Sequence, residues 1–311
     1  MTTPARTEGI IILGAPRSGT TLLRRLVDAH PNIACPGETN VFGACGRFLR
    51  SERIADGVAV GVLDGLGYAG FSASDVLARL RELAFSFHRE YAQRQAKPRW
   101  ASKTAFDAFY LEEIEQLCGE HASFVCIQRH GLDVAYSIEE LCNKNGVYLR
   151  ELHDYVIRYP RMLEAFAHVW VDLAGSIDAF AKRHSHNAIV VKYEDLTAQP
   201  DETMAQIMAF LREQWDAALV DRALEKREDL GLGDWKTYGR QSVDPASVGR
   251  WKGKSRDTVS RLAAICNPTL ILCGYDPVKL EAEISPEEAR RQYEIGLLLQ
   301  GLTQKPDRQR D

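Results

Sequence analysis

Short runs of β-branched apolar residues alternate along the chain with longer stretches in which apolar residues recur at helical spacing. The predicted pairs of strand and following helix are residues 10–13 and 20–30, 124–128 and 132–143, and 188–192 and 201–213. Strands that alternate with helices in this order are typical of crossover connections between parallel strands. The pattern therefore predicts an α/β fold in which helices flank a parallel β-sheet.

Other parts of the chain have less regular patterns. The pattern over residues 152–183 predicts a long helical stretch. Tyr159-Pro160 interrupts it, because proline disfavours helix continuation. Residues 43–70 and 231–253 predict irregular loops. A last helix is predicted over about 285–302, followed by a frayed polar tail. Since no linker divides the sequence, we expect residues 1–311 to form a single domain.

Composition narrows the classes of function and location. The chain has 311 residues, of which 45% are hydrophobic, and its formal net charge is −4, which argues against a nucleic-acid-binding surface. No apolar run approaches the ~18 residues of a membrane span. The seven cysteines are scattered, and neither a C-x-x-C pair nor clustered histidines complete a zinc set. We therefore expect buried thiols in the cytoplasm, no membrane partner and no metal.

The strand at residues 10–13 runs into a glycine loop that predicts phosphate binding. Backbone N–H groups in such a loop, together with the positive end of the following helix, bind an oxyanion. A Walker loop has lysine after its second glycine, but here Thr20 follows Gly19, and the nearby cation is Arg17. This argues against a triphosphate with magnesium. An ordinary tight turn is the structural alternative.

A second phosphate site is predicted where the strand at residues 124–128 passes into a helix. An arginine at the carboxyl end of a parallel strand points toward the ligand crevice, and Arg129 has this place. Ser137 follows eight residues later, on nearly the same helical face. Together the two side chains can clamp one phosphate. The alternative is an exposed arginine and a surface serine without a ligand.

These residues resemble the sulfotransferases that use 3′-phosphoadenosine 5′-phosphosulfate (PAPS) and release 3′-phosphoadenosine 5′-phosphate (PAP). Among the branches, the run from Pro16 to Pro31 and Gly37-Glu38-Thr39 are most similar to the tyrosylprotein sulfotransferases, which are Golgi-anchored. The resemblance implies a P-loop NTPase-like sulfotransferase fold and a 5′-phosphosulfate loop. The residues of that loop are Arg17, Ser18, Gly19, Thr20 and Thr21.

The resemblance also assigns further donor-binding residues. Arg129 and Ser137 match the pair that binds the 3′-phosphate, and Tyr193 matches a residue that contacts the cofactor. Lys254 and Arg250 lie in a loop that resembles one that folds over PAPS around a tryptophan. The chain departs from the tyrosylprotein branch at two positions. Leu141 replaces a basic residue, and Gly249 replaces a catalytic serine whose role is vacant or moves to Ser247 or Ser242.

For the transfer itself, the resemblance implies that Glu38 is the general base and that Lys103 donates to the leaving phosphate together with Arg17. The structural alternative for Glu38 is a carboxylate that stabilises the first turn of a helix over residues 39–49. Cytosolic sulfotransferases use a histidine base instead, but no histidine here lies in a matching motif. The candidates ranked below Glu38 are His30, His88, His121, His130 and His168.

The acceptor is less well defined. Asn40 and Ala44 stand where the tyrosylprotein branch has arginines that bind acidic peptides. A hydroxylated metabolite, a sugar or a phenol is therefore as well supported as a peptide tyrosine, and a homodimer is left open. The alternatives from other classes are a P-loop kinase, which needs the absent Walker lysine, and a non-catalytic module that binds PAPS or PAP.

Overall fold

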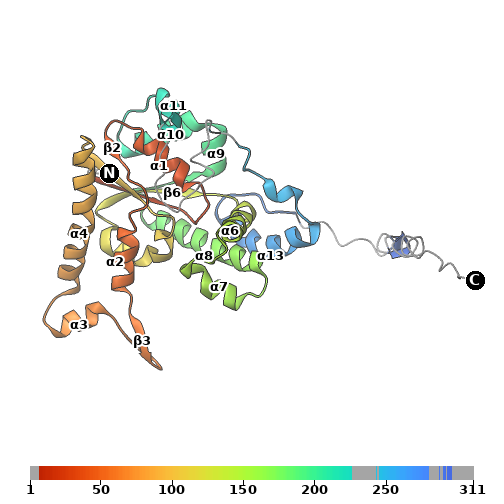
Figure 1. Ribbon diagram of the computed structural model, residues 1–311, viewed down its shortest axis with the longest axis horizontal. Helices are drawn as coiled ribbons and strands as arrows, with labels where there is room; N and C mark the ends of the chain where they lie inside the picture. The colour runs from red at the N-terminus through yellow and green to blue at the C-terminus, as the bar shows by residue number, and fades with distance from the viewer. Residues whose placement is uncertain are drawn as a thin grey trace, which may run out of the picture. The chain divides into compact units, whose positions relative to one another are not determined.

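The computed structural model describes residues 7–225, 243, 245–279, 287, 290–291 and 293–295 (Figure 1). The chain divides into two compact units, Met1–Pro277 and Val278–Asp311. The first unit contains the sheet and its helices. Most of the second lies outside the described residues, and so does most of the helix predicted at 285–302. The single domain expected over residues 1–311 stays a prediction.

The first unit is built on a five-stranded sheet in which every paired strand is parallel. Its order is β2 (Ile33–Ala34), β5 (Arg99–Lys103), β1 (Gly9–Leu13), β6 (Ala122–Gln128) and β7 (Ala188–Lys192). The predicted strands at 10–13, 124–128 and 188–192 are thus confirmed as β1, β6 and β7. Because β1 is central, the loop that follows it leaves the middle of the sheet at the carboxyl ends of the strands.

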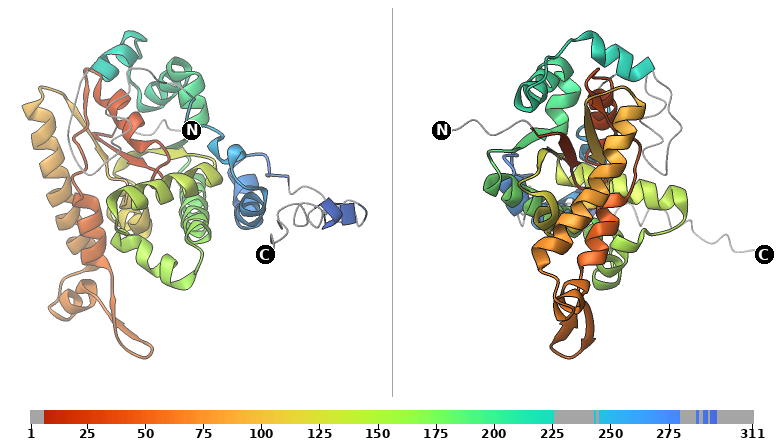
Figure 2. Two further views of the ribbon diagram at one scale, coloured as in Figure 1. Left: turned by 45° about the vertical axis from the view of Figure 1, so that its right-hand side comes forward. Right: turned by 90° about the vertical axis from the view of Figure 1, so that its left-hand side faces the viewer.

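Helices cover both faces of this sheet, which confirms the predicted fold class (Figures 1 and 2). On one face lie α1 (Thr20–Asp28), α9 (Tyr193–Ala198), α10 (Pro200–Leu211) and α11 (Ala218–Glu225). The other face carries α5 (Leu111–Cys118), α6 (Gly131–Asn145), α8 (Met162–Arg183) and α13 (Arg256–Leu272). A core of aliphatic side chains from β1, α1 and α10 fills the first interface, with Ile10, Leu23 and Ile207 completely buried.

The predicted helices are found with small shifts at their ends. Those at 20–30, 132–143 and 201–213 correspond to α1, α6 and α10. The interruption at Tyr159-Pro160 is confirmed, because it separates α7 (His153–Arg158) from α8. A short 3₁₀ helix, η2 (Arg150–Leu152), precedes α7.

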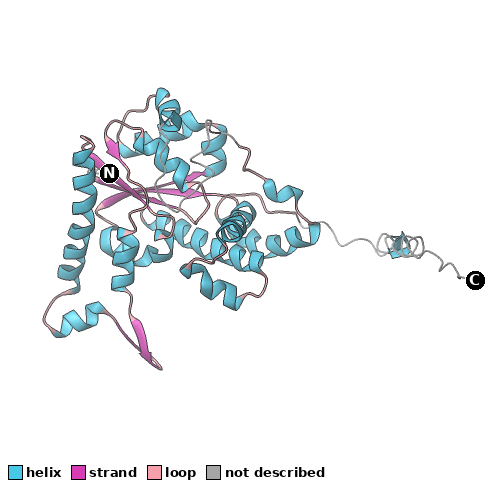
Figure 3. Cartoon of the chain, in the orientation of Figure 1, coloured by secondary structure: helices cyan, strands magenta, loops and turns pink. Residues whose placement is uncertain are grey.

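The prediction of an irregular loop over residues 43–70 is wrong. That stretch contains most of α2 (Val41–Leu49), the antiparallel hairpin of β3 (Glu52–Ala55) and β4 (Val58–Val60), and α3 (Val62–Tyr68). Figure 3 shows the hairpin apart from the main sheet. Its strands are exposed throughout, so no buried apolar pattern marks them. The following helix, α4 (Ala73–Arg94), packs against β5 and α5.

Two further observations concern the apolar character of the helices and the state of the cysteines. Among the described residues, no helix combines the length and the apolar character that crossing a membrane requires. All seven cysteines are buried free thiols.

Candidate active site

The β1–α1 loop is a tight turn at the carboxyl end of the central strand. The Ser18 N–H donates to the Ala15 carbonyl at 3.0 Å, and both Arg17 and Gly19 adopt left-handed backbone conformations, with φ of 71° and 95°. A Cβ at Gly19 would lie 2.2 Å from the Tyr193 ring. Glycine is therefore required here both by the positive φ and by the close approach of this ring.

Arg129 and Ser137 both contact Arg17 of this loop. Arg129 is 6% exposed, donates from Nη1 to the Arg17 carbonyl at 3.0 Å, and lies 4.5 Å from the centre of the Tyr193 ring. The Arg17 Nε donates to the Ser137 hydroxyl at 3.1 Å. The predicted donor residues Arg17, Arg129, Ser137 and Tyr193 thus form one contact network, with the Gly19 backbone against its aromatic member.

Glu38 lies on the other side of the loop, in contact with Lys103. The Lys103 Nζ donates to the Thr21 hydroxyl at 3.0 Å and to the Glu38 Oε1. Lys103 is 2% exposed and the Glu38 side chain 17%. Because α2 begins only at Val41 and has no acidic residue in its first turn, the alternative role of Glu38 in that turn is not supported.

A cavity of about 720 Å³ joins the loop to Glu38. Arg17, Thr20, Thr21 and Glu38 lie at its wall, which supplies charge and hydroxyl groups. Much of the remaining lining is apolar and comes from the segment after β5 and the end of α6. These side chains are Phe106, Leu141, Val147 and Leu149. The cavity thus combines a charged, hydroxyl-bearing end with an apolar wall, and none of the described histidines lines it.

Four of the five candidate histidines are held elsewhere by contacts that do not involve the cavity. The Nε2 of His30 is 2.8 Å from the Gln214 carbonyl, and His88 is buried beside Phe42. His130 stacks on Trp251, and burial lowers its pKa to about 4. His168 stacks on Tyr159. The described part of the chain therefore places Glu38, and no histidine, at the cavity wall.

The loop that carries Arg250 and Lys254 lies beside α6. Arg250 forms an exposed ion pair with Glu140 at 3.2 Å, and the Lys254 Nζ is 4.9 Å from the centre of the Tyr136 ring. Neither cation lines the cavity. Their roles in donor binding remain predictions.

The residue that anchors this loop lies in no motif that the sequence analysis identifies. The Asp133 carboxylate accepts the backbone N–H groups of Gly249 at 2.7 Å and Trp251 at 3.3 Å. Of the two serines considered for the vacant serine role, Ser247 accepts from Arg129 through its backbone carbonyl at 2.5 Å. Ser242 lies outside the described residues.

Asp107 is a second carboxyl group at the cavity wall, and it was missed because no motif contains it. Neither of its oxygens meets strict hydrogen-bond geometry with a described residue, although the Gly43 N–H and the Thr104 hydroxyl lie close enough to lower its pKa as hydrogen-bond donors. Burial, and then the negative charge of Glu38, raise its pKa to about 7, against the opposing charge of Lys103. Between these two values, 3.8 for an ordinary aspartate and about 7 here, Asp107 keeps its proton in the folded protein while a free aspartate is ionised.

Replacing Asp107 by asparagine should change how stability depends on pH. The unfolded carboxyl ionises near pH 3.8 and the folded one near pH 7, so the folded state binds more protons between these values. The stability that this group contributes is present at low pH and is lost as pH rises through 7. We expect the free energy of unfolding of the native protein to fall by about 2–3 kcal/mol between pH 5 and pH 8 through this group. Urea unfolding at both pH values measures it.

Asp107→Asn should remove most of this pH dependence and be the more stable form at pH 8. Asp56→Asn, at an exposed surface carboxylate, is the control and should leave the dependence as in the native protein. Identical slopes for Asp107→Asn and the native protein would show that Asp107 is ionised in the folded state at both pH values.

Comparison with known proteins agrees with this geometry. A family model described as the sulfotransferase family matches residues 9–217. Protein-tyrosine sulfotransferase 1 of Danio rerio is 27% identical over 285 residues, which cover 86% of this chain and 72% of that protein. The nodulation protein NoeE of Sinorhizobium fredii is 28% identical over 258 residues, covering 78% of this chain and 59% of that protein.

Among solved structures, the sulfotransferase domain from the curacin biosynthetic pathway is similar in fold. Its TM-score is 0.55 at 17% identity, and the alignment covers 88% of this chain and 100% of that domain.

Proposed function

We propose a residue-level mechanism for this chain, which belongs to the sulfotransferase family and is an enzyme that takes its sulfuryl group from PAPS. In this mechanism Glu38 accepts the proton of the acceptor hydroxyl as the hydroxyl oxygen attacks sulfur in line with the bond that breaks. PAPS supplies the sulfuryl group and leaves as PAP. The contact of Lys103 with both Glu38 and Thr21 is the observation that carries the proposal.

The side chains around the β1–α1 loop fit the two charged ends of such a donor. The buried Ser18 hydroxyl and the buried Arg129 Nε have no hydrogen-bond partner among the described residues, so both are available as donors to oxyanions. Arg129 with Ser137 would hold the 3′-phosphate. The backbone of the loop, Arg17 and the threonine hydroxyls would hold the 5′-phosphosulfate.

Lys103 links the proton acceptor to the site of the leaving group. Its ammonium group is buried and holds Glu38 through one N–H and Thr21 through another. In a loose group-transfer transition state, charge builds up on the leaving oxygen, and a positioned cation stabilises it. We propose that Lys103 and Arg17 supply this stabilisation, by analogy with phosphoryl transfer. A protonated Asp107 is neutral, so it would not offset the positive charge of Lys103 as an ionised Asp107 would.

The cavity wall supports an acceptor whose hydroxyl is attached to an apolar group. Phe106, Leu141 and Val147 can contact a ring or alkyl portion, while the Arg47 and Tyr110 side chains provide polar contacts at the same wall. The Arg47 Nη1 donates to the Tyr110 hydroxyl at 3.3 Å. We therefore propose a phenolic or similar hydroxylated acceptor, either a small molecule or a peptide tyrosine. The seven buried free thiols support the cytoplasm as its location.

Turnover with labelled donors tests the reaction class. We expect the purified protein to transfer label from PAPS to members of a phenol panel, and to transfer none from ATP with magnesium, because Thr20 stands where a Walker lysine would be. Mass spectrometry of the acceptor measures the added group. Phosphorylated product would establish the kinase alternative, and PAP binding without transfer to any acceptor would establish the non-catalytic one.

A further inference from the structure

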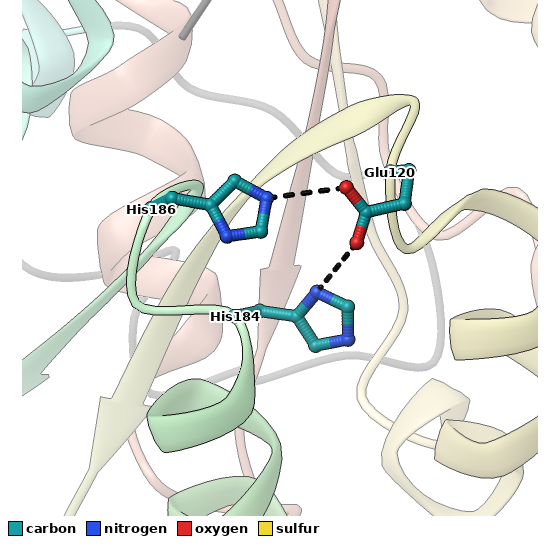
Figure 4. A group of neighbouring side chains, drawn as sticks. All are labelled: Glu120, His184 and His186. Atoms are coloured by element: carbon teal, nitrogen blue, oxygen red, sulfur yellow. Dashed lines mark hydrogen bonds and ion pairs between the residues drawn. The ribbon is translucent and has the colours of Figure 1, made fainter. Parts of the chain in front are cut away.

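We infer that Glu120, His184 and His186 form a binding site for a divalent transition metal, with zinc as the best match. Figure 4 shows the two imidazole rings directed at the two oxygens of one carboxylate. One ligand atom from each residue lies within 4.8 Å of the others. This site is separate from the cavity, and the proposed transfer does not use it.

Two turns bring the three residues together at the opposite end of the sheet from the β1–α1 loop. Glu120 lies in the turn between α5 and β6, and the two histidines lie in the turn between α8 and β7. Since β6 and β7 are parallel neighbours, with Phe124 paired to Ala188, the turns before them are adjacent. Glu120 and His184 are 64 positions apart, which is why sequence spacing indicated no zinc set.

One ligand atom from each residue lies near enough to the others for small shifts of the exposed Glu120 and His186 side chains to bring all three to one ion. The His186 Nε2 is 3.2 Å from the Glu120 Oε2, and the His184 Nδ1 is 3.4 Å from the Glu120 Oε1. Ligand atoms bound tetrahedrally at about 2.0–2.1 Å from zinc lie roughly 3.3 Å apart. Two imidazoles and one carboxylate favour zinc, copper or nickel over magnesium or calcium. The exposed Glu120 and His186 leave room for water as a fourth ligand.

His184 supplies the second and independent observation. Its side chain is nine-tenths buried, and its Nδ1 has no hydrogen-bond partner among the described residues although it faces Glu120. The opposite ring nitrogen, Nε2, lies 2.8 Å from the Glu115 carboxylate. If Nε2 carries the proton and donates it to Glu115, Nδ1 presents a lone pair to a carboxylate oxygen. That arrangement is repulsive unless a cation or a second proton lies between them.

The contact between His184 and Glu115 is the arrangement that commonly orients a metal-binding histidine. A ligating imidazole usually donates its other N–H to a carboxylate, which fixes the tautomer and the ring orientation. Arg183 binds the same carboxylate through two nitrogens, at 3.1 and 2.7 Å. The ring of His184 also packs on Phe180. His184 is thus held with Nδ1 directed toward Glu120.

Titration of the chelator-treated protein with zinc chloride tests the inference. We expect one zinc per chain by calorimetry, and with cobalt(II) the absorption of a tetrahedral site. His186→Gln removes an exposed ligand and should weaken zinc binding by at least about 10-fold. Glu115→Gln removes the orienting carboxylate and should weaken it by about 10–100-fold. His153→Gln, at an exposed histidine outside the group, is the matched control and should bind as the native protein does.

Thermal melting and turnover distinguish this site from the transfer site. Zinc should raise the melting temperature of the native protein but not that of His186→Gln, since a ligand that binds only the folded state stabilises it. PAP affinity and sulfuryl transfer at 25 °C should be the same with and without chelator, because the site lies at the far end of the sheet. Absence of stoichiometric zinc binding, or equal binding by His186→Gln, would overturn the inference. Glu120, His184 and His186 would then be held together by hydrogen bonds and ion pairs without a metal.

Discussion

Glu38→Gln should lower kcat by about 10²–10⁴-fold while PAP affinity changes little, because a positioned general base typically contributes that much to rate. The substitution keeps the size of the side chain and an oxygen that can accept from Lys103, but it removes the group that takes the proton. Rapid-mixing kinetics with PAPS and an acceptor give kcat, and calorimetry with PAP gives the binding constant. A reduction confined to kcat would identify the missing step as chemical.

The ion pair with Lys103 requires a control for stability. Lys103 is buried, so loss of its charged partner can destabilise the fold as well as the transition state. Glu113→Gln removes an ion pair with Arg50 outside the cavity, and it should leave kcat within a few-fold of the native value. Melting curves of both variants separate the loss of folded protein from the loss of rate. Near-native kcat in folded Glu38→Gln would mean that another group takes the proton.

The parts of the site that the sequence predicts are those fixed by local geometry. A strand, a left-handed glycine and a helix start follow one another within a few residues around Gly19, so the residue types themselves report the loop. Arg129 and Ser137 are equally local, since one directly follows β6 and the other lies on α6. The same reasoning finds β1, β6 and β7, each of which contains a short run of adjacent apolar residues.

The features of the site that sequence reasoning misses depend on which strands become neighbours in the sheet. Lys103 reaches both Thr21 and Glu38 because β5 lies between β1 and β2, the strands that precede these two residues in the chain. The strand β5 is completely buried yet contains Arg99, Ser102 and Lys103, so its polar residues hide it from a search for apolar runs. The burial of Asp107 follows from the same packing. No periodicity within one segment encodes these contacts.

The loop of Arg250 shows a different limit. Its cations and tryptophan predict phosphate and ring contacts, and the residue types alone do not tell which way the side chains point. The direction is set by Asp133, which holds the loop backbone from α6, and by Glu140, which pairs with Arg250. Both acidic residues belong to the helix that also carries Ser137.

Arg129→Ala should remove most of the preference of the protein for PAP over AMP. The two nucleotides differ by the 3′-phosphate, and a charge-assisted hydrogen bond to a phosphate contributes about 1.5–3 kcal/mol, or roughly 10–150-fold in affinity. The Arg129 guanidinium is fixed by the Arg17 carbonyl and the Tyr193 ring, so it needs little reorganisation to bind an anion. We expect the PAP affinity to fall by that factor and the AMP affinity to stay nearly constant.

Arg250→Ala is the matched control, because it also removes one positive charge but from an exposed pair with Glu140. If proximity to the β1–α1 loop decides nucleotide binding, Arg250→Ala should keep most of the preference for PAP. Its affinity for PAP should fall mainly at low salt, through the general loss of one positive charge. Calorimetry with both nucleotides at two salt concentrations distinguishes the contributions. Equal affinities of the native protein for PAP and AMP would contradict the 3′-phosphate site. A larger effect of Arg250→Ala than of Arg129→Ala would move that site to the loop around Trp251.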